Sequence, residues 1–406
     1  MKRILFVDDD KSALDSLRVM FHGMRETWDL AFVSNARAAM ELMGKTGAFD
    51  AVVTELRLPG ESGADFLRQV MMEFPLTVRL VLAANLNREA ISECAPIAHQ
   101  MLMKPCESQR LRGAVGRALS LQDRFSGTFL KTTLMNIGSL PSVPVVYTEI
   151  VQEMQREDFS IEKIGRIMER DAGMSAKVLQ IVNSAHFGLR HEVSNIVHAC
   201  ALLGLDNIRA FVLFARLISD IEGHKLPKGF SLNALWNHGL VVGGYAKRIA
   251  QHENATRKVV DNAYTAGLLH DIGLLILASQ LPEKLADIFA RAKAENKTVV
   301  DAEKLEIGAS HADIGGYLLD LWGLPTPIVT GITYHFYPST RPEAVYLDEE
   351  EAEFEALTAV HVANYFCEEQ DASPDELITP IDMNYLEEIG LGDRVGSWYD
   401  ACFKAK

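Results

Sequence analysis

Residues 267–273 read Gly-Leu-Leu-His-Asp-Ile-Gly, and this stretch decides how the longer, C-terminal part of the chain is interpreted. His270 and Asp271 stand next to each other in an otherwise apolar run. A buried imidazole and a buried carboxylate are costly unless they pair with each other or bind a metal. A lone histidine at such a place is more often a hydrogen-bonded core residue than a ligand, but the adjacent pair favours a site.

The sequence on both sides of this stretch has helical spacing, with almost no strand-like alternation from Val145 to about Asp400. Breaks fall at glycines and prolines such as Gly204, Pro227 and Pro282. No repeat of fixed period appears, so we expect a globular all-α domain and not a solenoid. The expected helices are 145–156, 161–169, 173–184, 193–201, 206–222, 232–252, 257–278, 282–296, 299–306, 309–322, 325–335 and 352–369.

Three more histidines of this part, His238, His311 and His335, join the pair as candidate ligands. Imidazole and carboxylate ligands suit Fe, Mn, Co or Zn better than Mg alone. The order of the residues resembles the HD superfamily of metal-dependent phosphohydrolases, whose motif is a histidine, a later His-Asp pair and a distant aspartate. The resemblance makes His238 the first ligand and His270-Asp271 the pair.

The same resemblance places Asn364 where the family has its distant aspartate, which exchanges a charged ligand for a neutral carbonyl that binds metal more weakly. His311 and His335 match extra histidines of the branch that acts on cyclic dinucleotides. Phe336 stands where that branch has one more histidine, and its Gly-Tyr-Pro signature is missing. These departures argue against catalysis.

The wider context is similar to the HDOD family, a signalling offshoot of this fold that is regarded as non-catalytic. The matching segments are Leu140-Pro141, Asp171–Leu179, Asn183–Gly188, Ala201–Gly204, Leu235–His238, Gly267–Gly273 and His311–Gly315. The resemblance implies a protein-interaction domain, with a residual metal-dependent phosphohydrolase or phosphodiesterase as the alternative.

The first 121 residues have a different pattern, in which short apolar strands alternate with helices. Strands are expected at 4–7, 30–33, 49–53, 78–83 and 101–103, and helices at 12–24, 36–43 (closed by Gly44) and 63–74. Such alternation predicts a doubly wound α/β domain with a parallel sheet, whose function lies at the carboxyl ends of the strands.

The expected strand ends carry Asp8 and Asp9, Glu55, and Lys104. Carboxylates and a lysine at one sheet edge suit a hard cation beside a phosphoryl group. Asp8–Asp10 alone fit the cap of a helix equally well. The turn Leu58–Gly60 and the dipeptide Lys104-Pro105 favour the site.

This part resembles the flavodoxin-like receiver domain of bacterial response regulators. The resemblance makes Asp8 and Asp9 the Mg²⁺-binding pair and Lys104 the lysine that contacts the phosphoryl group, followed by a proline that often has a cis bond. The phospho-acceptor position holds Glu55 in place of aspartate, and Ala83 replaces the hydroxyl residue that senses the phosphoryl oxygen. Met101 replaces the usual switch aromatic, so we interpret the domain as a pseudo-receiver that is fixed near one state or serves as a docking module.

Composition and charge limit the classes of partner that we expect this chain to bind. The chain is 48% hydrophobic, and no run of 18 apolar residues, the length of a membrane span, lacks a charge. Its five cysteines lie far apart and form no CxxC pair, which is typical of a cytoplasmic protein. The net charge is 0 over residues 1–121 and −1 over 122–342, so there is no basic excess for DNA. Residues 343–406 hold 3 basic and 17 acidic residues. That acidic segment is either a solvated helical face or a docking surface for a basic partner.

We therefore expect a receiver-like domain over 1–121, a linker over 122–140, an HDOD core over 141–342 and an acidic helical segment over 343–406 that packs on or extends the core. The predicted function is bacterial signal transduction of the two-component, phosphorelay type. Expected partners are a sensor kinase or a downstream regulator, with no direct contact to DNA or membrane, and a homo-oligomer is left open. Expected cofactors are Mg²⁺ at Asp8 and Asp9 and Fe, Mn or another divalent metal among the HDOD histidines.

Overall fold

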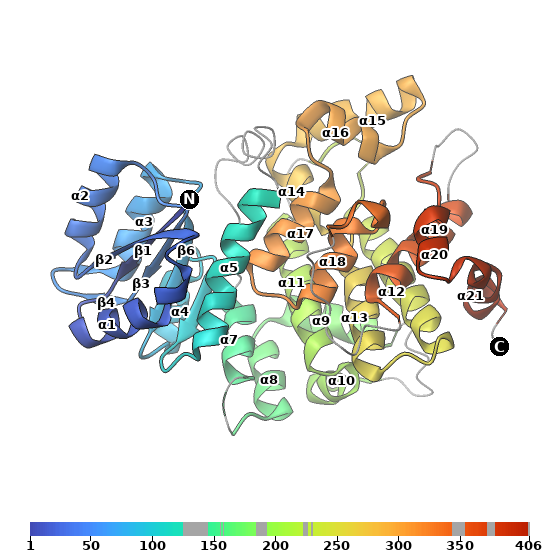
Figure 1. Ribbon diagram of the computed structural model, residues 1–406. Coiled ribbons are helices and arrows are strands. Elements are labelled where there is room, and N and C mark those ends of the chain that lie inside the picture. Colours follow the sequence, from blue (N-terminus) through green and yellow to red (C-terminus); the bar gives the residue numbers. More distant parts are fainter. Residues whose placement is uncertain are drawn as a thin grey trace. The chain divides into compact units, whose positions relative to one another are not determined.

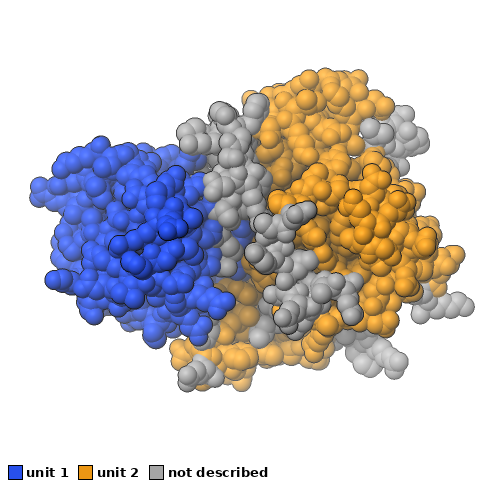
Figure 2. Space-filling view, in the orientation of Figure 1, with its two compact units in different colours: residues 1–149, 320–323 blue, residues 150–319, 324–406 orange. Residues whose placement is uncertain are grey.

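A computed structural model describes residues 1–124, 145–154, 156, 158–183, 193–221, 226–228, 230–342, 354–371 and 378–404. The chain forms two compact units, residues 1–149 with 320–323 and residues 150–319 with 324–406 (Figures 1 and 2). Each unit is considered by itself. The predicted segments Leu140-Pro141, 184–188 and the acidic run 348–351 lie outside the described residues, as does most of the predicted linker.

The first unit is built on a parallel five-stranded sheet in the order β2-β1-β3-β6-β7, which confirms the predicted α/β fold class. Its strands are β1 (Lys2–Val7), β2 (Trp28–Val33), β3 (Ala51–Thr54), β6 (Val78–Ala83) and β7 (Gln100–Met103), and a small hairpin pairs β4 (Arg57–Leu58) with β5 (Glu61–Ser62). Its helices are α1 (Lys11–Met20), the 3₁₀ turn η1 (His22–Met24), α2 (Ala36–Thr46), α3 (Gly63–Glu73), α4 (Arg88–Cys94) and α5 (Ser108–Arg124).

The boundaries correct several sequence expectations. The helix expected to close at Gly44 continues to Thr46, because the positive φ of 86° that ends it belongs to Gly47. The helix expected over 12–24 ends at Met20 and is followed by η1. Sequence reasoning missed α4, a short helix that Asn87 caps by accepting a hydrogen bond from the Ala90 N–H.

One face of the sheet is covered by α2, α3 and α4. Side chains of β1, β3 and β6, such as Leu5, Val52 and Val81, pack with Met43 and Phe66 in a single buried cluster. This burial on both sides of β1, β3 and β6 explains why these strands read as continuous apolar runs. Because the strands are parallel, the polar residues that follow them lie at one edge of the sheet.

The second unit is helical over its described residues, as predicted, and its helices follow one another from green to red in Figure 1. They are α7 (Val145–Glu153, which spans the boundary of the units), α8 (Ile161–Met168), α9 (Ala172–Val182), α10 (Ile196–Leu203), α11 (Leu205–Ile221), α12 (Leu232–His252), α13 (Arg257–Leu269), α14 (Ile272–Gln280), α15 (Pro282–Glu295), α16 (Val299–Ile307), α17 (His311–Leu321), α18 (Thr326–Tyr334), α19 (Ala356–Asp371), α20 (Met383–Glu388) and α21 (Val395–Phe403), with the 3₁₀ turns η2 (Pro338–Thr340) and η4 (Gly392–Arg394). No helix among the described residues is long and apolar enough to span a membrane.

The single helix expected over 257–278 is wrong, because the chain breaks at His270-Asp271 into α13 and α14. A Cβ atom on Gly273 would lie 1.9 Å from the His311 carbonyl oxygen, so only glycine lets α14 approach the start of α17. A Cβ atom on Gly267 would lie 2.8 Å from Gly243 Cα in α12. The two glycines therefore hold the His-Asp junction tightly between neighbouring helices.

The described part of the C-terminal segment packs on α12. Helix α19 contacts α12, α13 and α18, and α21 contacts α12. Trp398 donates its indole N–H to Glu253 Oε1 at 2.7 Å, and Arg248 donates to the Cys402 carbonyl oxygen at 2.7 Å. These contacts place α19 against the helices that carry His238 and His270.

Gly273→Ala tests the close approach of α14 and α17. The added methyl group must displace backbone, so we expect the free energy of unfolding of the helical unit to fall by about 1–3 kcal/mol. Gly396→Ala is the control, since nothing lies within 4 Å of a Cβ there and its position in α21 is exposed. Thermal unfolding of both variants checks this; equal melting temperatures would contradict it.

Candidate functional site

The carboxyl ends of β1, β3 and β7 bring Asp8, Glu55 and Lys104 into direct contact. Lys104 Nζ lies 2.5 Å from Asp8 Oδ2 and 2.8 Å from Glu55 Oε2. Burial lowers the pKa of Lys104, but the hydrogen bonds and charges of these two carboxylates outweigh burial and raise it. The lysine is therefore a fixed cation between two carboxylates.

Glu55 is held at both of its oxygens, because Oε1 accepts a hydrogen bond of 2.7 Å from the Leu56 N–H while Oε2 faces Lys104. Its side chain is only 10% exposed. Glu55, which the resemblance puts at the phospho-acceptor position, is thus in direct contact with Lys104.

The neighbouring acidic residues have separate roles. Asp10 caps α1, since its Oδ1 accepts a hydrogen bond of 2.8 Å from the Ser12 N–H, whereas Asp9 is exposed. The helix-cap alternative therefore holds for Asp10, whereas Asp8 lies against Lys104. Magnesium at Asp8 and Asp9 stays a prediction.

The other receiver positions singled out in the sequence lie at the ends of β6 and β7. Ala83 is fully buried, and its carbonyl oxygen accepts a hydrogen bond of 2.8 Å from the Lys104 N–H. Its methyl group offers no hydroxyl to a phosphoryl oxygen. Met101 is buried in the same core cluster, and the Lys104-Pro105 peptide bond is cis, as the resemblance implied.

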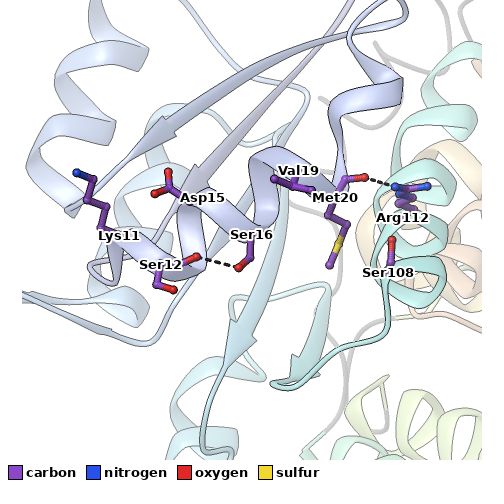
Figure 3. Close-up of a pocket in the computed structure, with 8 residues that line it drawn as sticks. All are labelled: Lys11, Ser12, Asp15, Ser16, Val19, Met20, Ser108 and Arg112. Atoms are coloured by element: carbon purple, nitrogen blue, oxygen red, sulfur yellow. Dashed lines mark hydrogen bonds between the residues drawn. The ribbon is translucent and has the colours of Figure 1, made fainter.

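A shallow groove lies elsewhere on the first unit, between α1 and α5 (Figure 3). Its lining residues come from α1 and α5, and Arg112 donates a hydrogen bond across it to the Met20 carbonyl oxygen. The strand-end residues Asp8, Glu55 and Lys104 are not among the lining residues.

The second unit gathers its candidate ligands from six helix positions. His238 lies in α12, His270 and Asp271 at the α13–α14 junction, His311 at the start of α17, His335 at the end of α18 and Asn364 in α19. All the predicted residues of this part therefore meet in one cluster, called the histidine cluster below.

The histidine cluster contains two groups of potential ligands, and Asp271 belongs to both. Within each group, the ligand atoms lie within 4.8 Å of one another. In the first, His238 Nε2 is 3.2 Å from His270 Nε2 and 3.7 Å from Asp271 Oδ2. His238 Nε2 is also 3.2 Å from Asn364 Oδ1. Metal–ligand bonds of about 2.1 Å place neighbouring ligand atoms about 3.0–3.4 Å apart. The two spacings of 3.2 Å fit one divalent ion, whereas the 3.7 Å between His238 Nε2 and Asp271 Oδ2 is slightly longer.

Hydrogen bonds on the far side of the rings orient their Nε2 atoms into the histidine cluster. His270 Nδ1 donates to the Gly267 carbonyl oxygen at 2.7 Å, and His335 Nδ1 donates to the Ile332 carbonyl oxygen at 2.7 Å. His335 Nε2 is buried and has no hydrogen-bond partner within the described residues. Such an outward hydrogen bond is the usual support of a metal-bound imidazole.

His311 is supported by a carboxylate that sequence reasoning missed. Its Nδ1 lies 2.8 Å from Oε2 of the fully buried Glu303, and its Nε2 lies 3.1 Å from Asp271 Oδ1. Glu303 also accepts the His311 backbone N–H at 2.9 Å. Burial lowers the pKa of His311, but the charge of Glu303 and the hydrogen bonds to Asp271 and Glu303 raise it to about 10.

The remaining electrostatics favour a cation at Asp271. Burial raises the pKa of Asp271, but the charge of His270 and the hydrogen bonds from His270 and His311 outweigh burial and hold it well below its usual range. Burial, and after it the positive charge of His270, hold the pKa of His335 well below its usual range. The histidine cluster thus combines an ionised carboxylate with a neutral imidazole.

Two further residues border the histidine cluster, one in α19 and one just after the end of α18. Cys367 Sγ lies 3.3 Å from His238 Nδ1. Phe336 packs its ring 3.9 Å from the His335 ring and 5.2 Å from the His311 ring, so an apolar ring fills the place of the further histidine. His270 and His335 are at most 1% exposed, and the side chains of His238 and Asp271 reach solvent at 21% and 14%.

Sequence reasoning missed Glu303, Cys367 and Glu368. Two of them lie near candidate ligands in the sequence: Glu303 lies eight residues before His311, and Glu368 lies one helical turn after Asn364. An acidic residue one turn from a ligand position on a buried helix is the signal that can find Glu368.

Both parts of the chain match known domain families. Residues 4–116 match the response regulator receiver domain, and residues 140–338 match the HDOD domain. The chain contains a receiver domain followed by an HDOD domain. The sequence-based assignment of both families is thereby confirmed, and the matches include no DNA-binding domain.

Individual relatives are distant. An uncharacterized protein of Treponema pallidum is 27% identical over 51% of this chain and 39% of its own length, and the response regulator protein PilR of Pseudomonas aeruginosa is 30% identical over 30% of this chain and 27% of its own. The chain thus spans less than half of these relatives. Among solved structures, an HDOD domain protein with unknown function from Geobacter sulfurreducens is similar at 23% identity and a TM-score of 0.49, over 68% of this chain and 90% of that one.

The raised pKa of His311 predicts a pH dependence of the metal-free protein. The folded state holds this proton more tightly than the unfolded state, so its stabilising contribution is complete below about pH 6.5 and is lost as the pH rises to about 10. Wild type in EDTA should therefore lose more unfolding free energy across that range than His311→Gln does. Urea unfolding at both ends of the range measures this; parallel pH profiles would refute the assignment of the proton to His311.

Proposed function

We propose that this chain is a bacterial signalling protein in which a receiver held in one state regulates a non-catalytic HDOD interaction domain. The observation that carries the proposal is the contact of Glu55 with Lys104. Receiver domains switch when phosphorylation adds negative charge beside this lysine. Glu55 supplies a permanent negative charge there, and Ala83 provides no hydroxyl to sense a phosphoryl oxygen.

The HDOD part of the proposal rests on what the histidine cluster lacks. Asn364 and Phe336 replace an aspartate and a histidine that hydrolysis of a phosphodiester would use, and most of the cluster is buried. We assign the receiver to 1–121, the HDOD core to 141–342 and an acidic extension to 343–406. Its partners are other signalling proteins, a sensor kinase or a downstream regulator, and it acts in the cytoplasm.

We also propose that His238, His270, Asp271 and Asn364 hold one divalent metal ion. The ligand spacings, the ionised Asp271 and the outward hydrogen bond of His270 support this site. A bound ion supplies a Lewis acid. In the proposed interaction domain it ties α12, α13, α14 and α19 together, because its ligands come from all of them.

A second candidate function, a metal-dependent phosphohydrolase, is favoured by one observation. Asp271 also belongs to a second ligand group with His311 and His335, and an aspartate shared by two groups suits a pair of metal ions. His311 has the carboxylate support of Glu303 that metal-bound imidazoles have in catalytic sites. Activity assays separate the two candidates.

The receiver proposal predicts no stable phosphorylation. Purified wild-type protein incubated with acetyl phosphate and Mg²⁺ should show no phosphoryl adduct in its intact mass, since the acceptor position holds glutamate. Glu55→Asp, which restores an acceptor of the usual length, is the matched comparison. A phosphoryl adduct in wild type that disappears in Glu55→Gln would overturn the pseudo-receiver assignment.

The HDOD proposal predicts metal binding without turnover. Untagged protein loaded with Mn²⁺ should melt at a higher temperature than in EDTA, because an ion that binds only the folded state stabilises it. Asp271→Ala should lose this increase, whereas the exposed-site control His252→Ala should keep it. Hydrolysis of bis(4-nitrophenyl) phosphate or of a cyclic dinucleotide that is lost in Asp271→Ala would establish the second candidate.

A further inference from the structure

The amide of Asn364 has a polar neighbour at each of its two ends. Its Nδ2 donates a hydrogen bond of 3.0 Å to Glu368 Oε1, and its Oδ1 lies 3.2 Å from His238 Nε2. A carboxylate oxygen accepts hydrogen bonds, which fits the amide nitrogen facing Glu368. The amide oxygen therefore faces the histidine cluster.

Glu368 is itself fixed in place. It lies four residues after Asn364 on the same face of α19, where side chains of a helix meet. Its Oε2 accepts a hydrogen bond of 3.3 Å from the Thr379 N–H, so both carboxylate oxygens are engaged. Neighbouring Glu369 is exposed and accepts from the Tyr365 hydroxyl instead.

A carboxylate behind an amide changes what the amide oxygen can do. Accepting the amide N–H polarises the amide and increases the negative charge on its oxygen. Burial raises the pKa of Glu368, while the hydrogen bonds from the Asn364 amide and the Thr379 N–H favour its ionised form. In that form the carboxylate adds negative charge near the metal ligands, and it stands behind Asn364 as Glu303 stands behind His311. Partners of this kind commonly set metal affinity by about 10–100-fold.

We infer that Asn364 and Glu368 act as a relay pair in which Asn364 Oδ1 is the oxygen ligand and Glu368 is the positioning residue that supplies the charge Asn364 lacks. The inference rests on the proposed metal ion at His238, His270 and Asp271. In this interpretation, the carboxylate that the family has at position 364 is found one helical turn later, at Glu368. The charge of the site is kept while its position changes.

The test compares Mn²⁺ affinity of the full chain, measured by titration of EDTA-stripped, dialysed protein. Glu368→Gln keeps the shape and a hydrogen-bond acceptor for Asn364 but removes the charge, and we expect Mn²⁺ binding to weaken about 10–100-fold. Glu369→Gln makes the same change of charge on the exposed side of α19 and should bind as wild type does. The melting temperature in EDTA identifies any variant that is merely unfolded.

A double variant moves the charge instead of removing it. Asn364→Asp combined with Glu368→Gln returns the carboxylate to the ligand position, and we expect it to regain at least the wild-type affinity. Equal affinities of Glu368→Gln and Glu369→Gln, or a double variant as weak as Glu368→Gln, would overturn the relay pair alone. Absence of Mn²⁺ binding in wild type would overturn the metal site of the proposed function and the relay pair with it.

Discussion

The contacts of the Asp271 carboxylate with His270 and His311 are the interaction on which the HDOD unit depends. Asp271 lies at the junction of α13 and α14, and His270 and His311 both reach its Oδ1. Because the carboxylate is mostly buried and ionised, the positive or polar groups around it are required for the fold and not only for a site. The glycines at 267 and 273 exist in this arrangement to let the flanking helices come close enough to deliver those groups.

The receiver uses the same physical device in a smaller form. Lys104 is placed between Asp8 and Glu55, and each of these residues directly follows a strand that is buried where it ends. A charged residue at such a depth needs its partner to be permanent. Glutamate at position 55 provides permanence, since its longer side chain reaches the lysine without any added group.

Much of this was predictable from the sequence, for reasons that differ between elements. The strand β1 ends in the apolar run Ile4–Val7, β6 is apolar except for Arg79, and α12 follows its helical period from end to end, so their positions were clear. The break between α13 and α14 was not, because the signal there is a close backbone approach at Gly273 that local pattern does not record. Likewise, His238, His270 and Asp271 stand out as residue types, whereas Glu303 and Glu368 look like surface glutamates until tertiary contacts bury them.

The contact between Glu55 and Lys104 has a consequence for timing under the proposed function. A phosphoryl group arrives and leaves, so an ordinary receiver keeps a record that fades with hydrolysis. A carboxylate that belongs to the side chain has no lifetime, and no phosphatase can erase it. Such a protein signals by how many copies the cell contains, which moves control from chemistry at the site to synthesis and degradation of the chain.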